Sequence, residues 1–369
     1  MSNSSSSINF SDEQYEKLRQ TYRDWWDNKL ERPIVPIITC NNPSSRKPSN
    51  APQIAFSTAW DFSISPQELV DAHDWYLSTL RWYGDAFPFF PMTSFGPGTI
   101  AAFLGCTPVM AEDTVWFDPP KKDIPIQELH FEVDENNPYL RRVLNVYEAA
   151  MEKWRGSVVV GMIDIGGTLD ILSSFRGSEN LLMDLYDEPE EVLRCVKEIN
   201  KAWFEYFDKI NAFIAPEAKG YSHWFNMFAE KPSYILQSDF SYMISTDMFE
   251  KFVKDELASS AQRIPNALYH MDGIGEIPHL EHLLSIDAIK AIQWVPGAGE
   301  PSLRNWDELL QKILDSGKKL ISCNQKPDGS AIDIAKNKLG QLYFDTRYFD
   351  ANDMASARSY AQMYGIKID

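Results

Sequence analysis

Short apolar runs recur along the chain, and helical patterns of apolar and polar positions separate many of them. Nearly continuous hydrophobic runs of this kind are typical of parallel strands that are covered on both faces. The predicted strands are 34–39, 85–90, 158–164, 234–240, 267–273, 291–297, 320–325 and 342–348. Clear helical patterns lie at 187–210 and 302–318.

This alternation predicts a (β/α)₈ barrel in one domain, with a doubly wound open sheet as the alternative fold. Two long segments, 41–84 and 91–157, exceed what short barrel loops need, so we expect them to be insertions. Lids over the barrel mouth are one role for them.

The start of the chain predicts a helix outside this repeat. Ser11 is a suitable N-cap, apolar positions follow at helical spacing, and the helix should end before the Arg32–Pro33 pair. The polar residues 1–10 are expected to form a disordered tail, and 11–369 a single barrel domain.

Polar side chains stand at the ends of several predicted strands. They are Asp164, Asp239, His270 with Asp272, Cys323 with Asn324, and Asp345 with Arg347, and Gln293 lies just before another strand end. In a barrel, the carboxyl ends of the strands converge on the face where active sites form. Asp is also a common helix N-cap, which is the structural alternative.

Composition narrows the function classes. The formal net charge of −18 argues against binding to nucleic acid or to anionic membranes, because both need a basic surface. The four cysteines show no paired spacing, no secretory signal is apparent, and no run approaches the roughly 18 apolar residues of a membrane span. We therefore expect a cytoplasmic protein.

The run "ALYHMDG" carries the strongest candidate chemistry. His270 and Asp272 stand two apart, so on a strand they share one face. The pair can bind a metal, act as an acid–base pair, or be a buried histidine with a hydrogen-bonded partner. Asp239, Cys323 and Asp345 are the available further ligands, and the glycines that follow favour close approach of a ligand.

Other candidates for substrate binding have structural alternatives of comparable weight. Arg176 suits a carboxylate or phosphate, or a salt bridge between helices. His223 and Trp224 lie in an aromatic-rich stretch that suits a ligand wall or core packing, and Asp85 follows a similar stretch. No serine-hydrolase elbow, zinc-protease motif or phosphate loop is present.

The chain as a whole resembles the uroporphyrinogen decarboxylase superfamily. The likeness runs over most of the chain from about residue 25. It is clearest in "QSDFSYMISTDMFEKFVKDEL", "ALYHMDG", "IQWVPGAG" and the C-terminal third. The resemblance implies a (β/α)₈ barrel, often a homodimer, with its site in the barrel mouth. The arginine-bearing loop of the haem-pathway enzyme is replaced here by "TCNNPSSRKPSN", which offers only Arg46 and Lys47. Haem synthesis is therefore not expected.

Members of the superfamily that methylate thiols have a His-x-Cys pair where this chain has His270 and Asp272. Asp272 thus replaces the cysteine of these members. The resemblance to the superfamily still implies methyl transfer between a corrinoid on a separate partner protein and a small acceptor. A zinc site of His270, Asp272 and Asp345 is one implication, and loss of the metal is the other. The implied catalytic residues are His270, Asp272, Asp239 and Asp164.

The implied substrate-binding residues are Gln293, Trp224, His223, Arg176, Arg347 and Asp85. A lyase or decarboxylase is the first alternative, with Arg176 or Arg347 holding an acid and Asp164 stabilising a cationic intermediate. A carbohydrate-active barrel is related to it, and a ligand-binding barrel without catalysis is the remaining one.

Overall fold

The structure is a computed structural model that describes residues 8, 10–297, 299–300, 306–322 and 338–368. The predicted tail thus lies mostly outside the described residues, although Ile8 is buried and Phe10 packs edge-on against Tyr15. The predicted strand-end residues Cys323 and Asn324 also lie outside them.

The secondary structure follows the sequence pattern closely. The α-helices are α1 (Asp12–Trp26), α2 (Pro66–Ser78), α3 (Ile100–Phe103), α4 (Pro138–Trp154), α5 (Thr168–Arg176), α6 (Ser178–Asp187), α7 (Pro189–Ile214), α8 (Thr246–Phe249), α9 (Asp255–Arg263), α10 (Leu280–Ser285), α11 (Asp307–Asp315) and α13 (Met354–Met363). The predicted cap is confirmed, because the Ser11 hydroxyl accepts from the backbone of Gln14, whose side chain returns the bond.

Every predicted strand position contains a strand. The strands are β1 (Pro36–Cys40), β2 (Arg81–Gly84), β3 (Phe89–Phe90), β4 (Thr107–Met110), β5 (Val115–Asp118), β6 (Val159–Val160), β7 (Ile235–Gln237), β8 (Ala267–Asp272), β9 (Ile289–Val295), β10 (Lys319–Ser322), β11 (Leu342–Phe344) and β12 (Arg347–Asp350). β3 is shorter than predicted because Pro88 has no N–H to donate to a ladder.

Parallel pairing dominates the sheets. β7 to β11 form a five-stranded parallel sheet in chain order, β3 pairs in parallel with β6, and β12 pairs in parallel with β1. Ile34 joins the start of the chain to the end of the large sheet, because it exchanges backbone bonds of 3.0 Å with Leu342 and Phe344. A mixed α/β fold is confirmed, but the ladders of the described residues do not form one continuous ring.

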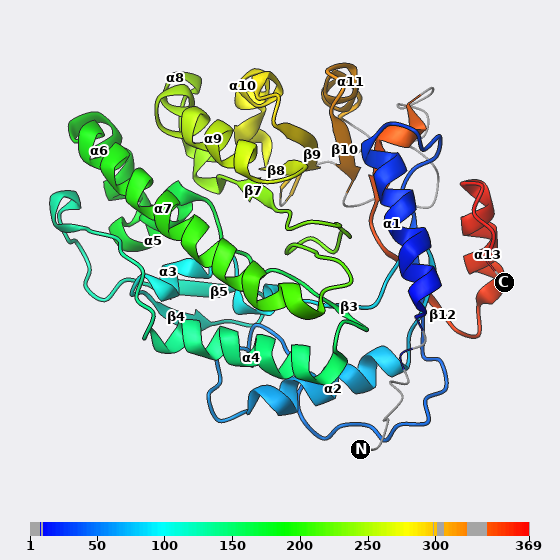
Figure 1. The fold of residues 1–369 in the computed structure, drawn as a ribbon. Helices are drawn as coiled ribbons and strands as arrows, with labels where there is room; N and C mark the ends of the chain where they lie inside the picture. The colour runs from blue at the N-terminus through cyan, green and yellow to red at the C-terminus, as the bar shows by residue number, and fades with distance from the viewer. Residues whose placement is uncertain (1–7, 9, 298, 301–305, 323–337, 369) are drawn as a thin grey trace.

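The helices lie outside the strands. Figure 1 shows α8 to α11 along the outer side of β7 to β10, while α4 and α7 run beside each other elsewhere on the molecule. In the described part of the chain, no helix is long and apolar enough to cross a membrane.

Two hydrophobic clusters divide the side chains of each strand. Alternate residues such as Leu236, Tyr269 and Ile292 pack in the large cluster with the helices. The residues between them form a second cluster that takes a side chain from every predicted strand: Ile34, Phe87, Val159, Ile235, Leu268, Ala291, Ile321 and Tyr343. The strands therefore share one inner face, as period-2 alternation requires.

Helix α1 covers the amino ends of the strands. Its Tyr15, Leu18, Tyr22 and Trp25 belong to the inner cluster. The Trp25 indole N–H donates to the carbonyl of Leu342 at 3.1 Å, where β11 begins, and the Tyr15 hydroxyl donates to the carbonyl of Ser157, before β6. Among the described residues, α1 therefore covers the amino ends of the inner face, opposite to the carboxyl ends of the strands.

The long segments 41–84 and 91–157 are folded parts of the core. They supply α2 and β2, and then α3, the β4–β5 hairpin and α4. Helix α4 buries Val143, Val146 and Tyr147 completely, and it packs against α2. A role as lids stays a prediction.

Candidate functional site

On four strands of the large sheet, β7, β8, β9 and β11, the inner face changes from apolar to polar two residues further along. Ile235 is followed by Gln237, Leu268 by His270 and Asp272, Ala291 by Gln293, and Tyr343 by Asp345. In the sheet register, His270 lies between Gln237 and Gln293. Together with Asp239, which follows β7, we call Gln237, His270, Asp272 and Gln293 the strand-end cluster.

His270 is held in one orientation. Its Nδ1 lies 2.6 Å from Oε1 of Gln293, and its Nε2 lies 3.9 Å from Oδ2 of Asp272. Because the Gln293 oxygen accepts, the imidazole proton sits on Nδ1 and the Nε2 lone pair is free. Burial lowers the pKa of His270, and the charge of Asp272 opposes this only in part, so the ring is neutral at pH 7.

Trp224 forms a wall beside this histidine. The two rings meet edge to face with centroids 5.1 Å apart, and the indole N–H donates to the carbonyl of Ile235 at 3.1 Å. The predicted aromatic stretch therefore reaches the strand-end cluster through Trp224. Its neighbour His223 is buried, burial lowers its pKa to about 3, and its Nδ1 has no partner among the described residues.

Asp239 begins η4 (Asp239–Met243). The residue is exposed to solvent, although neighbouring protein groups pack around its carboxyl. This surrounding protein raises its pKa to about 7, and the negative charges of Asp272 and Asp164 add to the shift. Its backbone is held in place by Asp170 of α5, whose carboxylate accepts from the N–H groups of Asp239 and Phe240 at 3.1 and 2.7 Å. Asp239 is thus a positioned carboxyl group that can exchange a proton near neutral pH.

Further carboxyl groups surround the cluster. Asp164 is buried, accepts from Gly166 and Tyr234, and has its pKa raised to about 7 by burial. Glu276, in η6 (Ile274–His279), is buried and accepts from the Tyr269 hydroxyl at 2.9 Å; burial and then Asp239 raise its pKa well above normal. None of these carboxylates pairs with lysine or arginine in the described part of the chain.

Two predicted substrate-binding residues are occupied elsewhere. Arg32 holds Asp85 through two bonds of 2.6 and 2.9 Å, and Asp85 also accepts from the backbone of Val35. Arg176 binds both oxygens of Asp184 at 2.5 and 3.1 Å, which is the salt bridge between helices that the sequence left open. We leave Asp85 and Arg176 out of the site.

Arg347 and Asp345 follow β11 but differ in surroundings. The Arg347 guanidinium lies 5.7 Å from the ring centre of Tyr360, in the outer helix α13. Oδ1 of Asp345 is buried without a partner among the described residues, and burial raises the pKa of this carboxyl to about 7. The inner face therefore offers acceptors at this strand, and Arg347 packs on the outer helix.

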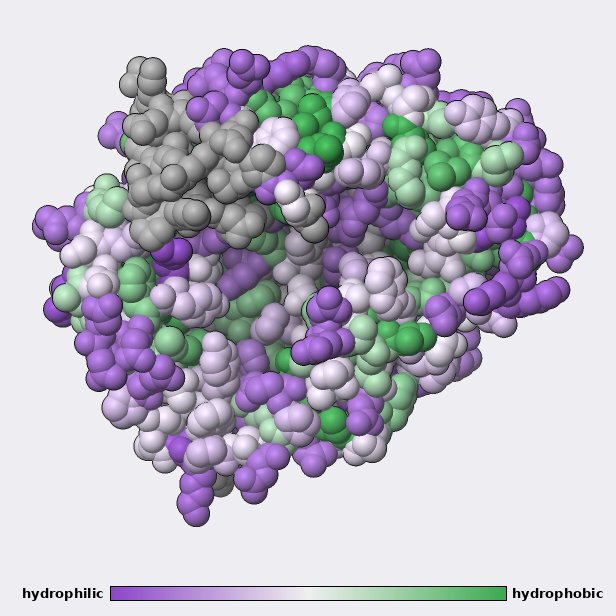
Figure 2. Space-filling view, turned by 180° about the vertical axis from the view of Figure 1, so that it is seen from behind, coloured by the Kyte–Doolittle hydropathy of each residue, from purple (hydrophilic) through white to green (hydrophobic). Residues whose placement is uncertain are grey.

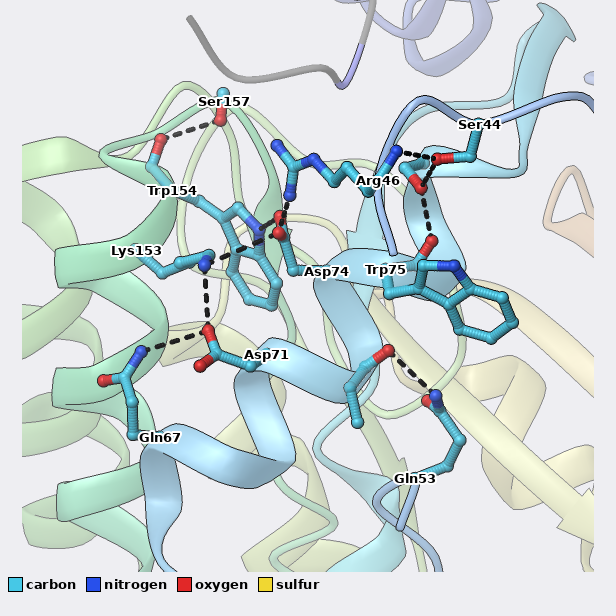
Figure 3. A network of polar contacts seen from close by, with 12 residues as sticks. Ser44, Arg46, Gln53, Gln67, Asp71, Asp74, Trp75, Lys153, Trp154 and Ser157 are labelled. Atoms are coloured by element: carbon cyan, nitrogen blue, oxygen red, sulfur yellow. Dashed lines mark hydrogen bonds and ion pairs between the residues drawn. The ribbon is translucent and has the colours of Figure 1, made fainter. Parts of the chain in front are cut away.

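The arginine that replaces the missing arginine loop is also engaged. Figure 3 shows Arg46 and Lys153 converging on Asp74, whose other oxygen accepts from the Trp154 indole at 2.9 Å. Lys153 reaches Asp71 at 2.8 Å as well. This network fastens the loop after β1 to α2 and α4, so Arg46 is not available to a substrate carboxylate.

The predicted zinc set is not assembled. Across residues 8, 10–297, 299–300, 306–322 and 338–368, no three histidine, cysteine or carboxylate side chains are grouped to hold a metal. His270 uses Nδ1 for Gln293, so that only its Nε2, 3.9 Å from Oδ2 of Asp272, remains to bind a ligand. The described residues alone do not assemble a zinc site, the candidate ligand Cys323 lies outside them, and zinc binding stays a prediction; we derive no step through a metal.

The sequence indicated that the glycines after β8 let a ligand approach the backbone, but in the structure they make room for the side chain of Tyr242. A Cβ on Gly273, where φ is +84°, would lie 2.8 Å from the Tyr242 ring, and a Cβ on Gly275 would meet the same residue. The loop is therefore shaped to receive Tyr242, a residue that is 48% exposed and packs over these glycines. Sequence reasoning missed Tyr242 and Gln237, although alternation from Ile235 indicates the latter.

The face opposite to that of Figure 1 is mostly hydrophilic at its rim, and Figure 2 shows it hollowed near the centre. Asp272, at the end of β8, has a side chain that is 40% exposed, whereas that of His270 is 13% exposed. The strand-end cluster therefore combines a sheltered imidazole with carboxylates that solvent can reach.

Comparisons with known proteins show a fold shared with a solved structure. No family model matches the chain, and no curated protein matches it. A solved structure of a methyltransferase from Methanosarcina mazei matches with a TM-score of 0.59 and 12% sequence identity. The match covers 94% of this chain and 99% of that chain, so the two share a fold over nearly their whole length.

Proposed function

We propose that the chain is a (β/α)₈ enzyme of the uroporphyrinogen decarboxylase superfamily that transfers a methyl group between a corrinoid on a separate protein and a small acceptor. Three features support this: the inner cluster fed by eight strands, the fold shared with a methyltransferase, and the polar residues at the carboxyl ends.

The observation that carries the proposal is the neutral, oriented imidazole of His270 beside Asp272, whose charge also acts on Asp239. A methyl acceptor must lose a proton when its lone pair forms the new bond to carbon. His270 Nε2 can accept that proton, and Asp239 has a pKa near the pH at which a general base works best. The methyl donor supplies a methyl group and keeps the electron pair of the broken bond.

Each residue of the cluster then has a role. Gln293 fixes the tautomer of His270, Asp272 faces the proton that Nε2 receives, and Trp224 limits the space beside the ring. Asp164 lies further in and acts on Asp239 through its charge.

The test uses methylcobalamin as the methyl donor and a panel of thiol, amine and folate acceptors. We expect loss of the methylcobalamin spectrum with one acceptor class, and a fall of about 100-fold or more in His270→Ala, since proton transfer contributes that much. His130→Ala removes an exposed histidine and is the matched control. Absence of transfer to every acceptor class would overturn the proposal.

A carbohydrate-active enzyme is the second candidate. It is favoured by Asp239, because burial and the negative charges of Asp272 and Asp164 raise the pKa of this carboxyl group to about 7. Glycosidases use such a protonated acid beside a second carboxylate. Turnover of aryl glycosides that is lost in Asp239→Asn would favour this function over methyl transfer.

The lyase alternative has less support from the geometry. It needs a cation for a carboxylated substrate, and Arg46, Arg176 and Arg347 are engaged with Asp74, Asp184 and Tyr360. If neither methyl transfer nor glycoside cleavage is found, a ligand-binding barrel is the remaining interpretation.

A further inference from the structure

Among the described residues, the strand-end cluster and its surroundings carry several carboxylates and no partner cation. Asp239 experiences the charges of Asp272 and Asp164, and Asp170 experiences that of Asp239. In the described part of the chain, none of these four carboxylates forms an ion pair with lysine or arginine. Carboxylates that repel one another are costly in a folded protein, so their retention points to a cation that binds among them.

A second observation is independent of charge. Gln237 is 8% exposed and lies on the inner face next to His270, and its Oε1 has no hydrogen-bond partner among the described residues. Buried acceptors of this kind are rare because each loses its bonds to water. Gln237 therefore needs a donor, and a ligand above the inner face can supply one.

Aromatic rings complete the surroundings. The Trp224 ring stands beside His270, and Tyr242 lies on the glycine loop next to Asp272. The faces of such rings attract cations. The described part of the cluster thus combines negative charge, a free acceptor and nearby aromatic rings, and it contributes no positive group to bind an acid.

We propose that the strand-end cluster binds a protonated amine, with Asp239 and Asp272 facing the ammonium group and Gln237 Oε1 accepting one of its N–H donors. The inference rests on the proposed function, in which this amine is the methyl acceptor. Nε2 of His270, the base of the proposed function, takes one proton from the ammonium, and the freed lone pair forms the N–C bond to the incoming methyl group. The donor keeps the electron pair of its broken bond, and the product is again an ammonium that the carboxylates stabilise.

The test compares the binding of three probes of similar shape to the full chain. Titration calorimetry or ligand-observed NMR measures their dissociation constants. Benzylamine carries a positive charge, benzyl alcohol none and benzoate a negative one. We expect benzylamine to bind about tenfold more tightly than benzyl alcohol, and benzoate to bind most weakly. Benzoate binding as well as or better than benzylamine, or no binding of benzylamine, overturns the inference.

Variants then locate the site. Asp239→Asn, Asp272→Asn and Gln237→Met should each weaken benzylamine binding by roughly fivefold to tenfold and leave benzyl alcohol nearly unchanged. Asp247→Asn removes the same charge from an exposed position in α8 and should have no effect. Equal losses in the Asp247 variant would mean that only net charge matters, and would overturn the assignment to the cluster.

The two proposals can fail separately. Preferred benzylamine binding without methyl transfer to any amine leaves the amine site in place and rejects the proposed function. Methyl transfer to a thiol or folate, with no preference for benzylamine, keeps the proposed function and rejects the amine site. Thermal melting of each variant shows whether a loss of binding reflects a loss of folding.

Discussion

His270 is sheltered, neutral and fixed by one hydrogen bond, and these three properties have a common origin. The ring lies on the inner face between Gln237 and Gln293, where burial disfavours the charged form. A neutral amide, not a carboxylate, holds its Nδ1. The protein therefore keeps a base that is ready to accept a proton at neutral pH.

This arrangement predicts the effect of a nearly isosteric change, Gln293→Glu. A carboxylate beside Nδ1 stabilises the imidazolium and should raise the pKa of His270, so the base becomes protonated at neutral pH. Activity at pH 7 should fall by about tenfold or more and recover in part as the pH rises above the new pKa. The pH profile of kcat measures this, and an unshifted profile would remove His270 as the base.

At the scale of elements, α1 determines which end of the strands is open. Its indole and tyrosine groups bind backbone at the amino ends, and Lys319 stacks over the Trp25 ring at 4.7 Å while it donates to Asn28. The polar layer then faces the opposite end. The position of the candidate site follows from a helix that contributes nothing to its chemistry.

Two adjacent tryptophans of α1 allow a matched test of this role. Trp25 is completely buried and Trp26 is half-buried. Trp25→Ala should lower the free energy of unfolding by about 3–5 kcal/mol, whereas Trp26→Ala should cost about 1 kcal/mol. Urea unfolding measures both, and equal effects would contradict the packing role assigned to Trp25.

The sequence predicts the elements well and the long-range pairs poorly. Each of the eight apolar runs contains a strand, although others such as β4 and β5 were not predicted. Alternation places His270, Asp272 and Gln293 on the inner face, where Trp224 packs against His270 and the charge of Asp272 acts on Asp239. The pair of Arg32 with Asp85 spans 53 positions, and no local pattern indicates it. The role of Gln237 on the inner face was not predicted, because a single polar residue at the end of an apolar run is equally typical of the start of a turn.

At the scale of the whole molecule, the carboxylates predict how stability depends on pH. Burial raises the pKa of Asp164, Asp170 and Asp345 to about 7, from a normal value near 4. A group whose pKa is raised on folding stabilises the protein fully below its unfolded pKa, and this stabilisation is lost as the pH rises through the folded value. The window for these groups is therefore about pH 4 to pH 7.

Asp164→Asn tests this dependence, because the amide oxygen can still accept from Gly166 and Tyr234 while the charge is removed. The variant should gain stability relative to the unchanged protein as the pH rises, by about 1–3 kcal/mol between pH 4 and pH 8. Chemical denaturation across this range measures the difference. A difference that does not change with pH would show that Asp164 is not protonated in the folded protein.

The bond between Trp25 and Leu342 joins residues 317 positions apart, and Ile34 pairs with the same strand. During synthesis, α1 leaves the ribosome long before β11 exists, so its apolar face has no partner for most of that time. Only a nearly finished chain can seal the amino ends of the strands. The helix made first is therefore among the last elements to find its place, and an interrupted chain would expose the inner cluster to water.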